Sequence, residues 1–321
     1  MLICQAPLRI SFFGGGSDLP AFLKNNEGQV LSTAINRRIY IIGHESSYVS
    51  GIQFRYSQIE VVDHPELLQH PIARVVLSRY GLNNLEVAVL SDIPAGTGLG
   101  SSSAFTVALL AFARTISGQR FTSADLASEA CEIEIGTLNE PIGFQDQWIS
   151  AIGGIQKMTF RGKSVATEAI HLSSHDLQLL EASIFLVPVG KPRRASDFLS
   201  SQSAAIEPGS RAERDTRRLA ALVERGVEAI QRDHKQLGPL LDQAWRVKRE
   251  IVDGVSNATI DVVYESGLAV GATGGKLLGA GGGGFFMFVV PEMSRDRFRS
   301  HFPDAFSVSL AAEGAGVVNA N

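Results

Sequence analysis

The residues best suited to chemistry lie in the stretch PAGTGLGSSSA, at positions 94–104. Its glycines leave backbone N–H groups uncrowded by side chains, and its serines add hydroxyls. The run that follows, VALLAFARTISG, has good helix formers, no proline and a terminal glycine, so we expect a helix from about 101 to 117. A helix start offers unpaired amide donors and the positive end of its dipole. The stretch therefore predicts a cradle for a phosphate group.

A carboxylate on an apolar helix face is the second candidate. A helix is expected from about 123 to 139, beginning at the capping motif TSAD. At spacings of three and four, Glu134 shares a face with Ala130 and Leu138, whereas Glu129 gathers with other polar residues on the other side. A carboxylate removed from water must be neutralised, paired or bound to a metal. A structural ion pair with an arginine and a Mg²⁺ ligand are both open for Glu134.

A further acidic residue, Asp146, stands in EPIGFQDQW, after a proline and a glycine that end this helix. The turn they form is rigid, so it would fix the direction of the carboxylate.

Two other glycine-rich segments do not carry the function that their patterns suggest. GAGGGG, residues 279–284, fits G-x-G-x-x-G, but it precedes the strand-like FFMFVV instead of opening a helix, which excludes a dinucleotide-binding fold. ATGGKLLG lacks the first glycine and the final Ser or Thr of a P-loop, because Val270 and Leu277 occupy those places. The histidines form no H-E-x-x-H motif, and the serines form no G-x-S-x-G elbow.

The elements that must position these residues include several strands and helices. Strands are expected in four segments rich in β-branched and aromatic residues: PLRISFF, GQVLSTAINRRIYIIGHES, IQFRYSQIEVVD and LEVAVLSDI. Asp18 with Leu19 and Pro20 opens a short helix, and residues 67–80 are expected to be helical.

The second half of the chain begins with a polar, transitional segment at 165–182, after which ASIFLVPVG restarts a strand. Residues 200–250 are charged and expected to be helical. Their apolar positions form one stripe: Leu219, Leu222, Val223, Val227 and Ile230.

Composition restricts the class of protein. With 321 residues, 45% apolar and 19% charged, the chain can form two domains that share a cleft. The net charge of -4 and the pI near 6.0 argue against a nucleic-acid partner. Cys4 and Cys131 are too few for a disulfide framework, and no apolar run reaches the ~20 residues of a membrane span. The expectation is a cytoplasmic protein with no membrane association.

Three motifs together resemble those of the GHMP kinases, the superfamily of galactokinase, homoserine kinase, mevalonate kinase and phosphomevalonate kinase. PAGTGLGSSSA resembles the phosphate-binding motif, and APLRISFFGGGSD and GGKLLGAGGGGFF resemble the first and third motifs in the right order. Within the superfamily the chain is similar to sugar-1-kinases that act on D-glycero-D-manno-heptose 7-phosphate. This similarity continues through EIEIGTLNEPIGFQDQW and QAWRVKREIVDGVSN.

The resemblance implies an α+β fold with the active site in a cleft between two domains. Residues 1–180 would form an N-terminal domain of the ribosomal-protein-S5-domain-2 type, and residues 181–321 a ferredoxin-like C-terminal domain. It also implies ATP and Mg²⁺ as cofactors, with Ser102 and Glu134 as the metal ligands.

The same resemblance assigns the other site residues. Asp146 matches the catalytic aspartate that faces the substrate hydroxyl, Arg9 matches the arginine beside it, and Asp18 matches the acid that holds sugar hydroxyls. The nucleotide phosphates would be wrapped by Pro94, Gly96, Thr97, Gly98, Leu99, Gly100, Ser101, Ser102 and Ser103. The site would be closed from the other domain by Gly281, Gly282 and Gly283.

The substrate loop departs from the galactokinases, which carry Glu and His where this chain has Gly15 and Gly16, next to Ser17. The exchange removes hydroxyl contacts and opens space, which suits a longer sugar with a bulky end. In VGKPRRASD, Arg193 matches an arginine of the heptose kinases, although Val189 replaces their threonine. Two interpretations are open for this basic segment: a solvated surface, or a site for the distal phosphate of the sugar. Its cations are Lys191, Arg193 and Arg194.

These expectations lead to a kinase that phosphorylates the anomeric hydroxyl of a long-chain aldose phosphate. D-glycero-D-manno-heptose 7-phosphate is the first choice, giving the 1,7-bisphosphate for nucleotide-sugar biosynthesis. The alternatives are an octose 8-phosphate of antibiotic biosynthesis, a free sugar of the fucose or galactose type, and a catalytically silent sugar and ATP sensor. The anomer and the oligomeric state, with a homodimer as one option, cannot be read from the sequence.

Overall fold

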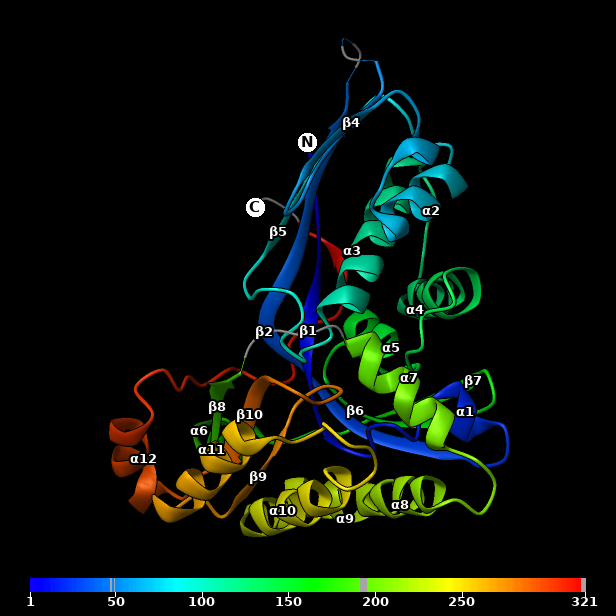
Figure 1. Cartoon of the computed structure of the whole chain (residues 1–321). Coiled ribbons are helices and arrows are strands. Elements are labelled where there is room, and N and C mark those ends of the chain that lie inside the picture. The colour runs from blue at the N-terminus through cyan, green and yellow to red at the C-terminus, as the bar shows by residue number, and fades with distance from the viewer. Residues whose placement is uncertain (47, 49, 191–194, 319–321) are drawn as a thin grey trace.

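In the part of the chain that the structure describes, the strands form a large and a small sheet (Figure 1). The structure is a computed structural model that describes residues 1–46, 48, 50–190 and 195–318. The eight strands of the large sheet run in the order β11-β1-β2-β5-β3-β4, with β6 paired to β2 and β7 paired to β6. The small sheet has the order β8-β10-β9. All pairs are antiparallel except β3 with β5.

The large sheet is built mainly from the first half of the chain. Its strands are β1 (Leu2–Phe13), β2 (Gly28–Glu45), β3 (Ile52–Arg55), β4 (Ile59–Val62), β5 (Leu85–Ser91), β6 (Ile155–Arg161), β7 (Ser164–Ala169) and β11 (Gly316–Val317). The helices of this half are α1 (Pro20–Leu23), η1 (Pro65–Leu67), α2 (Pro71–Arg79), α3 (Ser101–Ile116), α4 (Ser123–Cys131), η2 (Glu132–Thr137) and α5 (Gln145–Ile152).

The second half of the chain supplies the small sheet and most of the remaining helices. Its strands are β8 (Ile184–Val189), β9 (Gly274–Leu277) and β10 (Gly284–Val289). Its helices are α6 (Ser174–Ser183), α7 (Ala195–Ala205), α8 (Arg211–Ala220), α9 (Leu222–Arg232), η3 (His234–Gln236), α10 (Leu237–Lys248), α11 (Ala258–Ala269), η4 (Glu292–Ser294) and α12 (Arg295–His301). The boundary expected after residue 180 falls inside α6, just before β8.

One helix organises the core of the first half. α3 packs against β1 and β2, with α2, α4 and α5 beside it on the same side of the sheet (Figure 1). Its residues from Ser103 to Ala113 are all buried, so it is covered on every side. A helix this enclosed has little freedom to shift, and it begins at the end of the predicted phosphate loop. The core therefore fixes the position of that loop.

The helices α8, α9 and α10 join the two sheets. α8 and α9 contact β2, and α10 contacts both β1 and β9. The apolar stripe expected in this region lies on two helices, because α8 ends at Ala220 and α9 begins at Leu222. Leu219 belongs to α8, and the other residues of the stripe belong to α9. Leu222, Val223 and Ile230 are buried as their pattern predicts.

Several element boundaries differ from the sequence expectation. The strand-like segment IQFRYSQIEVVD forms two strands, β3 and β4, with a turn at residues 56–58. The transitional segment 165–182 contains β7 and α6, which pattern reading missed because β7 is mostly exposed and has no apolar face. The capping box at Thr122 and Asp125 is confirmed.

The predicted helix 123–139 is α-helical only as far as Cys131, and it continues as the π-helix η2. Its last turn is widened, as the bond from Leu138 N to the Ile133 carbonyl shows. An inserted residue of this kind changes which side chains share a face, and a rule based on spacings of three and four cannot detect it. Such widened turns are frequent at functional sites.

Glu129, expected on the polar face of this helix, is buried. Its carboxylate is 9% exposed and accepts hydrogen bonds from Arg114 (2.7 Å), Arg79 (3.3 Å) and the hydroxyl of Tyr80 (2.8 Å). Burial and the neighbouring carboxylate raise the pKa of Tyr80 to about 12. This network ties α2, α3 and α4 together near the C-terminal end of α3.

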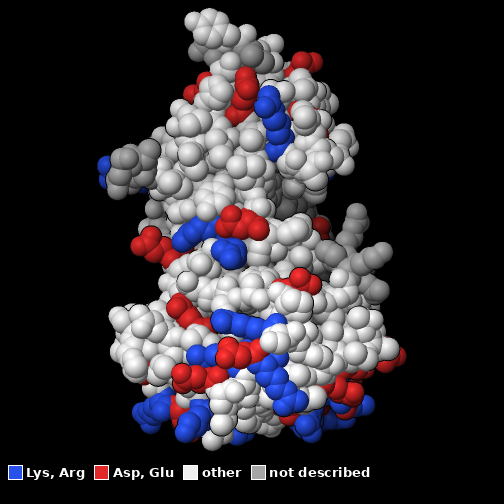
Figure 2. All heavy atoms as spheres, turned by 90° about the vertical axis from the view of Figure 1, so that its left-hand side faces the viewer, with Lys and Arg blue, Asp and Glu red and all other residues white. Residues whose placement is uncertain are grey.

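The charges on one face of the molecule are mixed in sign. Figure 2 shows Lys and Arg interspersed with Asp and Glu over the lower half of this face, whereas its upper half is largely uncharged. The described residues visible there form no continuous basic stripe. This face therefore lacks the pattern that a nucleic-acid backbone requires.

Replacing Glu129 with glutamine should lower the free energy of unfolding by about 2–3 kcal/mol, because two guanidinium groups lose a buried partner. Glu132→Gln is the matched control, since this side chain is 65% exposed and its carboxylate, among the described residues, bonds only Arg79; it should change stability by less than about 0.5 kcal/mol. Urea unfolding at pH 7 measures both. Equal effects would mean that the Glu129 network does not hold the helices together.

Candidate active site

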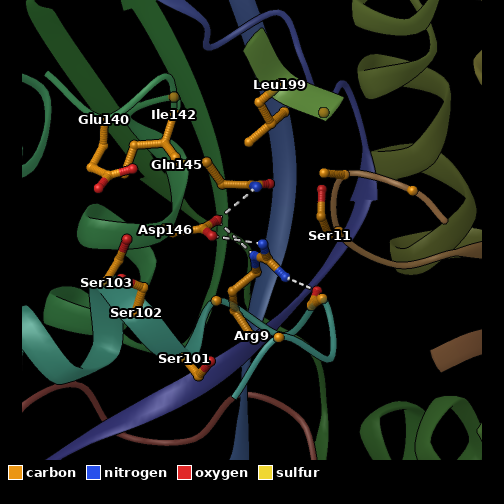
Figure 3. A pocket seen from close by; sticks show the side chains of 18 of the residues that line it. Arg9, Ser11, Ser101, Ser102, Ser103, Glu140, Ile142, Gln145, Asp146 and Leu199 are labelled. Carbon is orange, nitrogen blue, oxygen red and sulfur yellow. Dashed lines mark hydrogen bonds and ion pairs between the residues drawn. The ribbon is translucent and has the colours of Figure 1, made fainter. Parts of the chain in front are cut away.

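A cavity of about 960 Å³ opens between the phosphate loop, the substrate loop and the C-terminal half of the chain. Its wall includes β1, the starts of α3 and α5, the glycine loop that precedes β10, and residues of α7 and α10. Figure 3 shows the side chains of Arg9, Asp146 and Gln145 meeting in this cavity, with Ser102 and Ser103 to the left, Ser101 below and Leu199 above. The volume suits a ligand of small-molecule size.

The phosphate loop has a regular backbone. Gly96, Gly98 and Gly100 have φ values of +78°, +82° and +76°, so every second residue is left-handed. Gly100 is the N-cap residue of α3, and the helix starts at Ser101. Residues other than glycine rarely adopt these angles, which explains the spacing of glycines in the sequence. The start of α3, with its unpaired amides and the positive end of the helix dipole, therefore lies at the cavity.

Two glycine-rich segments approach each other closely at the cavity wall. A Cβ atom on Gly98 would lie 2.6 Å from the carbonyl oxygen of Leu278, and one on Gly279 would lie 2.4 Å from the Cα of Gly98. A Cβ on Gly284 would lie 2.4 Å from the carbonyl oxygen of Thr97. The N-terminal phosphate loop and the C-terminal glycine loop can touch only because these positions lack side chains.

Arg9 and Asp146 form a two-pronged ion pair in the cavity (Figure 3). Arg9 Nε donates to Asp146 Oδ1 at 2.7 Å, and Nη2 donates to Oδ2 at 2.6 Å. The remaining nitrogen, Nη1, donates to the carbonyl oxygen of Gly98. Gln145 adds a third donor, with Nε2 at 3.0 Å from Asp146 Oδ1. This carboxylate is thus fixed in direction relative to the phosphate loop.

Asp18 lies at the end of the substrate loop, beside the start of α5. Its carboxylate accepts hydrogen bonds from the backbone N–H groups of Gly16 and Gln145, at 3.0 and 3.1 Å. Burial, and then the charge of Asp146, raise the pKa of Asp18 above its ordinary value. Gly143 makes room for it, since a Cβ at that position would lie 1.9 Å from Asp18 Oδ2.

Glu134 is almost fully buried behind the serines of the phosphate loop. Its Oε2 accepts from Ser103 (2.8 Å) and Gln147 (2.7 Å), and its Oε1 accepts from Thr106 (2.9 Å) and more weakly from Ser102 (3.4 Å). Among the described residues no arginine or lysine forms an ion pair with it, and its hydrogen-bond partners are neutral hydroxyl and amide groups. Burial raises the pKa of Glu134 to about 7, although these hydrogen bonds lower it.

The surroundings of Glu134 fit a magnesium ion that is shared with a substrate. Ser102 Oγ and Glu134 Oε1 are 3.4 Å apart, close to the separation of about 3 Å between adjacent oxygen ligands at 2.0–2.1 Å from an octahedral Mg²⁺. In the described part of the chain, no three His, Cys, Asp or Glu side chains gather as a metal site. The remaining ligands of such an ion would come from phosphates and water, as is usual for Mg²⁺.

The structure brings most of the site residues expected from the sequence to one cavity. Those that line it are Arg9, Gly15, Gly16, Asp18, Gly96, Gly98, Gly100, Ser101, Ser102, Ser103, Asp146, Gly281 and Gly283.

Six expected residues do not line the cavity: Pro94, Thr97, Leu99, Gly282, Ser17 and the buried Glu134. Leu99 is buried and its carbonyl accepts from Arg9 N, while the Thr97 hydroxyl donates to the carbonyl of Pro94. The hydroxyl of Ser17 donates to the carbonyl oxygen of Gln29 and accepts from the N–H group of the same residue. These two bonds hold it away from the cavity. The basic segment with Lys191, Arg193 and Arg194 lies outside the described residues.

Several residues that line the cavity were not predicted from the sequence. Gln145 directly precedes Asp146 in the sequence. This position was the only feature from which its place in the cavity could have been predicted. Leu199 and Gln202 come from α7. Tyr56, His70 and Phe105 form an aromatic cluster, with ring centroids 5.0 Å and 4.7 Å apart for its two closest pairs. The two lysines that line the wall are Lys248 and Lys276.

Fold and site together define a kinase with a glycine-rich phosphate loop between two sheets. Residues 67–154 match the GHMP kinases N terminal domain, and residues 220–308 match the GHMP kinases C terminal domain. These matches cover more than half of the chain, one in each half. The chain therefore belongs to the GHMP kinases, as the three motifs predict, and it is a phosphotransferase.

Similar proteins include several kinases of small molecules. The chain is 28% identical over 304 residues to D-glycero-alpha-D-manno-heptose 7-phosphate kinase of Campylobacter jejuni, which covers 89% of this chain and 88% of that protein. It is 24% identical over 378 residues to human galactokinase, covering 99% and 92%. The solved structure of a D-glycero-D-manno-heptose 1-phosphate kinase from Bacteroides thetaiotaomicron matches with a TM-score of 0.81 at 21% identity, over 100% of both chains. The expected fold class is thereby confirmed.

A search of the described residues finds no helix with both the length and the apolar character that a membrane span requires.

The buried carboxylate of Glu134 should make stability depend on pH when Mg²⁺ is chelated. Its pKa rises from an ordinary 4.5 to about 7 on folding, so the folded state holds the extra proton between these values. Stability from this group therefore falls as pH rises from about 4.5 to 7, by about 3 kcal/mol in all.

Glu134→Gln cannot titrate, so the stability of this variant relative to the natural protein should increase by about that amount between pH 4.5 and pH 8. Urea unfolding with EDTA present measures the difference at each pH. A difference that stays constant across this range would show that Glu134 is ionised as easily in the folded chain as in the unfolded one.

Proposed function

We propose that this protein transfers the terminal phosphate of ATP to the anomeric hydroxyl of a long-chain aldose phosphate, with D-glycero-D-manno-heptose 7-phosphate as the first choice. The observation that carries the proposal is the Asp146 carboxylate, which Arg9 holds beside the phosphate loop, in a cavity that Gly15 and Gly16 also line. The similarity to a heptose 7-phosphate kinase over 89% of the chain supports this substrate class.

The proposed chemistry follows from these positions. Phosphoryl transfer depends on alignment and charge neutralisation more than on covalent catalysis. Asp146 would accept the proton of the attacking hydroxyl while the bond between the terminal phosphorus of ATP and its bridging oxygen breaks. An anomeric hydroxyl is more acidic than an ordinary alcohol, so a carboxylate is a sufficient base. Arg9 keeps this carboxylate aimed at the hydroxyl and ties it to the carbonyl of Gly98.

Ser102 and Glu134 are the residues that would hold Mg²⁺. The ion would supply positive charge to the phosphates of ATP. The chain's own contribution is the row of amides at the start of α3 and the hydroxyl of Ser101 beside them. These groups would orient the phosphates so that the terminal one points toward Asp146.

The aromatic cluster offers a place for the base of the nucleotide. Phe105 lies on α3, one turn beyond the serines that begin the helix, and Tyr56 and His70 pack beside it. Ile39 and Val89 complete an apolar wall at this end of the cavity. A planar purine ring gains from stacking on such side chains, and its phosphates would then reach the glycine loop.

The sugar would lie between the substrate loop and α7. Asp18 is one hydrogen-bond acceptor there, and the amide of Gln202 lies directly over Gly16, since a Cβ on Gly16 would be 2.4 Å from Gln202 Nε2. Among the described residues, the structure records no hydrogen bond for the Gln202 side chain. It is therefore free to bind a hydroxyl of the sugar, and glycine at position 16 makes room for it.

Two other sugar classes and one other role are kept as alternatives. An octose 8-phosphate would need only slightly more space at the same site, and a free sugar would leave the distal end of the cavity empty. A silent sugar and ATP sensor would have little use for the complete set of Arg9, Asp146 and Glu134. We also propose a reducing, cytoplasmic location, which the free and buried Cys4 and Cys131 support.

The experiment that tests the function is a substrate panel with Mg·ATP, followed by phosphorus NMR. It pairs free and terminally phosphorylated hexoses, heptoses and octoses. We expect an anomeric phosphate only on the phosphorylated long-chain sugars, with the highest kcat/KM for the heptose. Equal turnover of free sugars would contradict the proposed substrate class.

Asp146→Asn is the matched variant for this panel, because it keeps the size of the side chain. We expect it to bind ATP normally and to lose about 10²- to 10⁴-fold in kcat. ATP binding without turnover of any sugar by the natural protein would favour the sensor.

Gln202→Ala should raise KM for the sugar roughly tenfold while KM for ATP changes less than twofold, because one hydrogen bond to the substrate is lost. Gln119→Ala, at an exposed position outside the cavity, is the control and should change neither constant. If Gln202→Ala altered both KM values equally, α7 would act on the cavity as a whole and not on the sugar.

A further inference from the structure

Two lysines line the cavity without a carboxylate partner. Lys248 ends α10, and Lys276 lies on β9. Within the described part of the chain, neither forms an ion pair, and their hydrogen-bond partners are carbonyl oxygens of the backbone. A cation taken from water into a protein interior is costly unless an anion accompanies it. The arrangement is therefore incomplete unless an anion enters the cavity.

Lys276 has a structural explanation. Its side chain is only 5% exposed, and its Nζ donates to the carbonyl oxygens of Ser11 (2.9 Å) and Phe12 (3.0 Å). These bonds connect the small sheet to β1, two residues after Arg9. Burial, followed by the charges of Lys248 and Arg9, holds the pKa of Lys276 well below its ordinary value. Its contacts tie the two halves of the chain together.

Lys248 is different because it is only partly buried and still faces the cavity. Its Nζ donates to the carbonyl oxygens of Leu277 (3.1 Å) and Gly279. An ammonium group has three N–H donors, so one is left over. Burial and the charge of Arg9 lower the pKa of Lys248 to about 7. An anion bound beside this nitrogen would offset both the cost of burying the charge and the repulsion by Arg9.

The anchoring carbonyls place Lys248 near the phosphate loop. Gly279 packs against the Cα of Gly98, and the carbonyl of Gly98 accepts from Arg9. Arg9 is neutralised by Asp146, which leaves Lys248 as a cation without an anionic partner beside the loop. A phosphate held there would contact both the amides of the loop and this ammonium group.

We propose that Lys248 is a phosphate-binding residue of the active site, held beneath the glycine loop by two carbonyls so that its remaining N–H contacts a phosphate group of a bound substrate. The inference rests on the proposed function, since it requires that phosphorylated substrates enter this cavity. The phosphate is either the terminal one of the nucleotide or the one carried by the sugar, and binding measurements distinguish these sources.

The test compares four ligands by titration calorimetry: Mg·ADP, its triphosphate analogue Mg·AMP-PNP, a heptose and the same heptose 7-phosphate. Lys248→Met removes the charge, and Lys248→Arg keeps it. Lys235→Met, at an exposed site outside the cavity, is the control and should bind all four ligands as the natural protein does.

If the nucleotide is the source, Lys248→Met should weaken AMP-PNP roughly ten- to hundredfold and ADP less than threefold. If the sugar is the source, the same loss should appear for the heptose 7-phosphate and not for the free heptose. In either case Lys248→Arg should restore most of the affinity, because it returns a positive donor. Each of these two results supports the proposal.

Unchanged binding of all four ligands by Lys248→Met would overturn the proposal. So would an equal loss for all four that Lys248→Arg does not restore, because that pattern belongs to a residue that only shapes the glycine loop. Should Lys248→Met fail to fold, Lys248→Gln keeps a donor for the Gly279 carbonyl without the charge and gives the same comparison.

The failure of this inference can be told apart from that of the proposed function. If the natural protein phosphorylates a sugar and Lys248→Met binds every ligand normally, only the inference is wrong. If the natural protein binds AMP-PNP but turns over no sugar, only the proposed function is wrong, and the nucleotide arm still tests Lys248.

Discussion

The bidentate pair of Arg9 and Asp146 is the interaction on which the rest of the site depends. Arg9 comes from the large sheet and Asp146 from the first turn of α5, 137 residues further along the chain. The same guanidinium holds the carbonyl of Gly98, so one side chain fixes β1, α5 and the phosphate loop relative to each other. A carboxylate with both oxygens engaged cannot rotate freely, which preserves its direction in the cavity before any ligand arrives.

A second constraint is the absence of side chains where the two halves of the chain meet. Gly98 and Gly279 approach so closely that a methyl group on either would require one loop to move. The lysines Lys248 and Lys276 act on the same junction by donating to carbonyls of β1 and of the glycine loop. The two halves of the chain are therefore joined at the cavity wall by close packing of glycine backbones and by lysine side chains that donate to backbone carbonyls.

Much of this site could be predicted from the sequence because its chemistry is concentrated in short motifs. Glycines at alternating positions before a helix specify a left-handed loop at a helix start, and the structure has this geometry at Gly96, Gly98 and Gly100. The presence of Asp146 and Arg9 in one cavity followed from the resemblance to a family, since no local rule relates residues so far apart. The predicted metal roles of Ser102 and Glu134 stay predictions.

Other features could not be read from the sequence for physical reasons. The burial of Glu129 depends on two arginines from other helices, so its position on a polar helix face was misleading. The widened turn at Glu134 inserts a residue into the helix and breaks the periodicity on which the prediction relied. Gln202 and Lys248 lie in charged or polar helices, and only tertiary structure shows that these two side chains face the cavity.

The pairing of β11 with β1 has a consequence for the order in which the fold can be completed during synthesis. Cys4 and Gln5 of β1 pair with Val317 and Gly316, more than 300 residues later. Until those residues leave the ribosome, the strand that bears Arg9 has one edge with unpaired backbone groups, and such edges can pair with other chains. The pairing of β1 is thus completed only after more than 300 further residues have been made, which favours a nascent chain that stays shielded while they are synthesised.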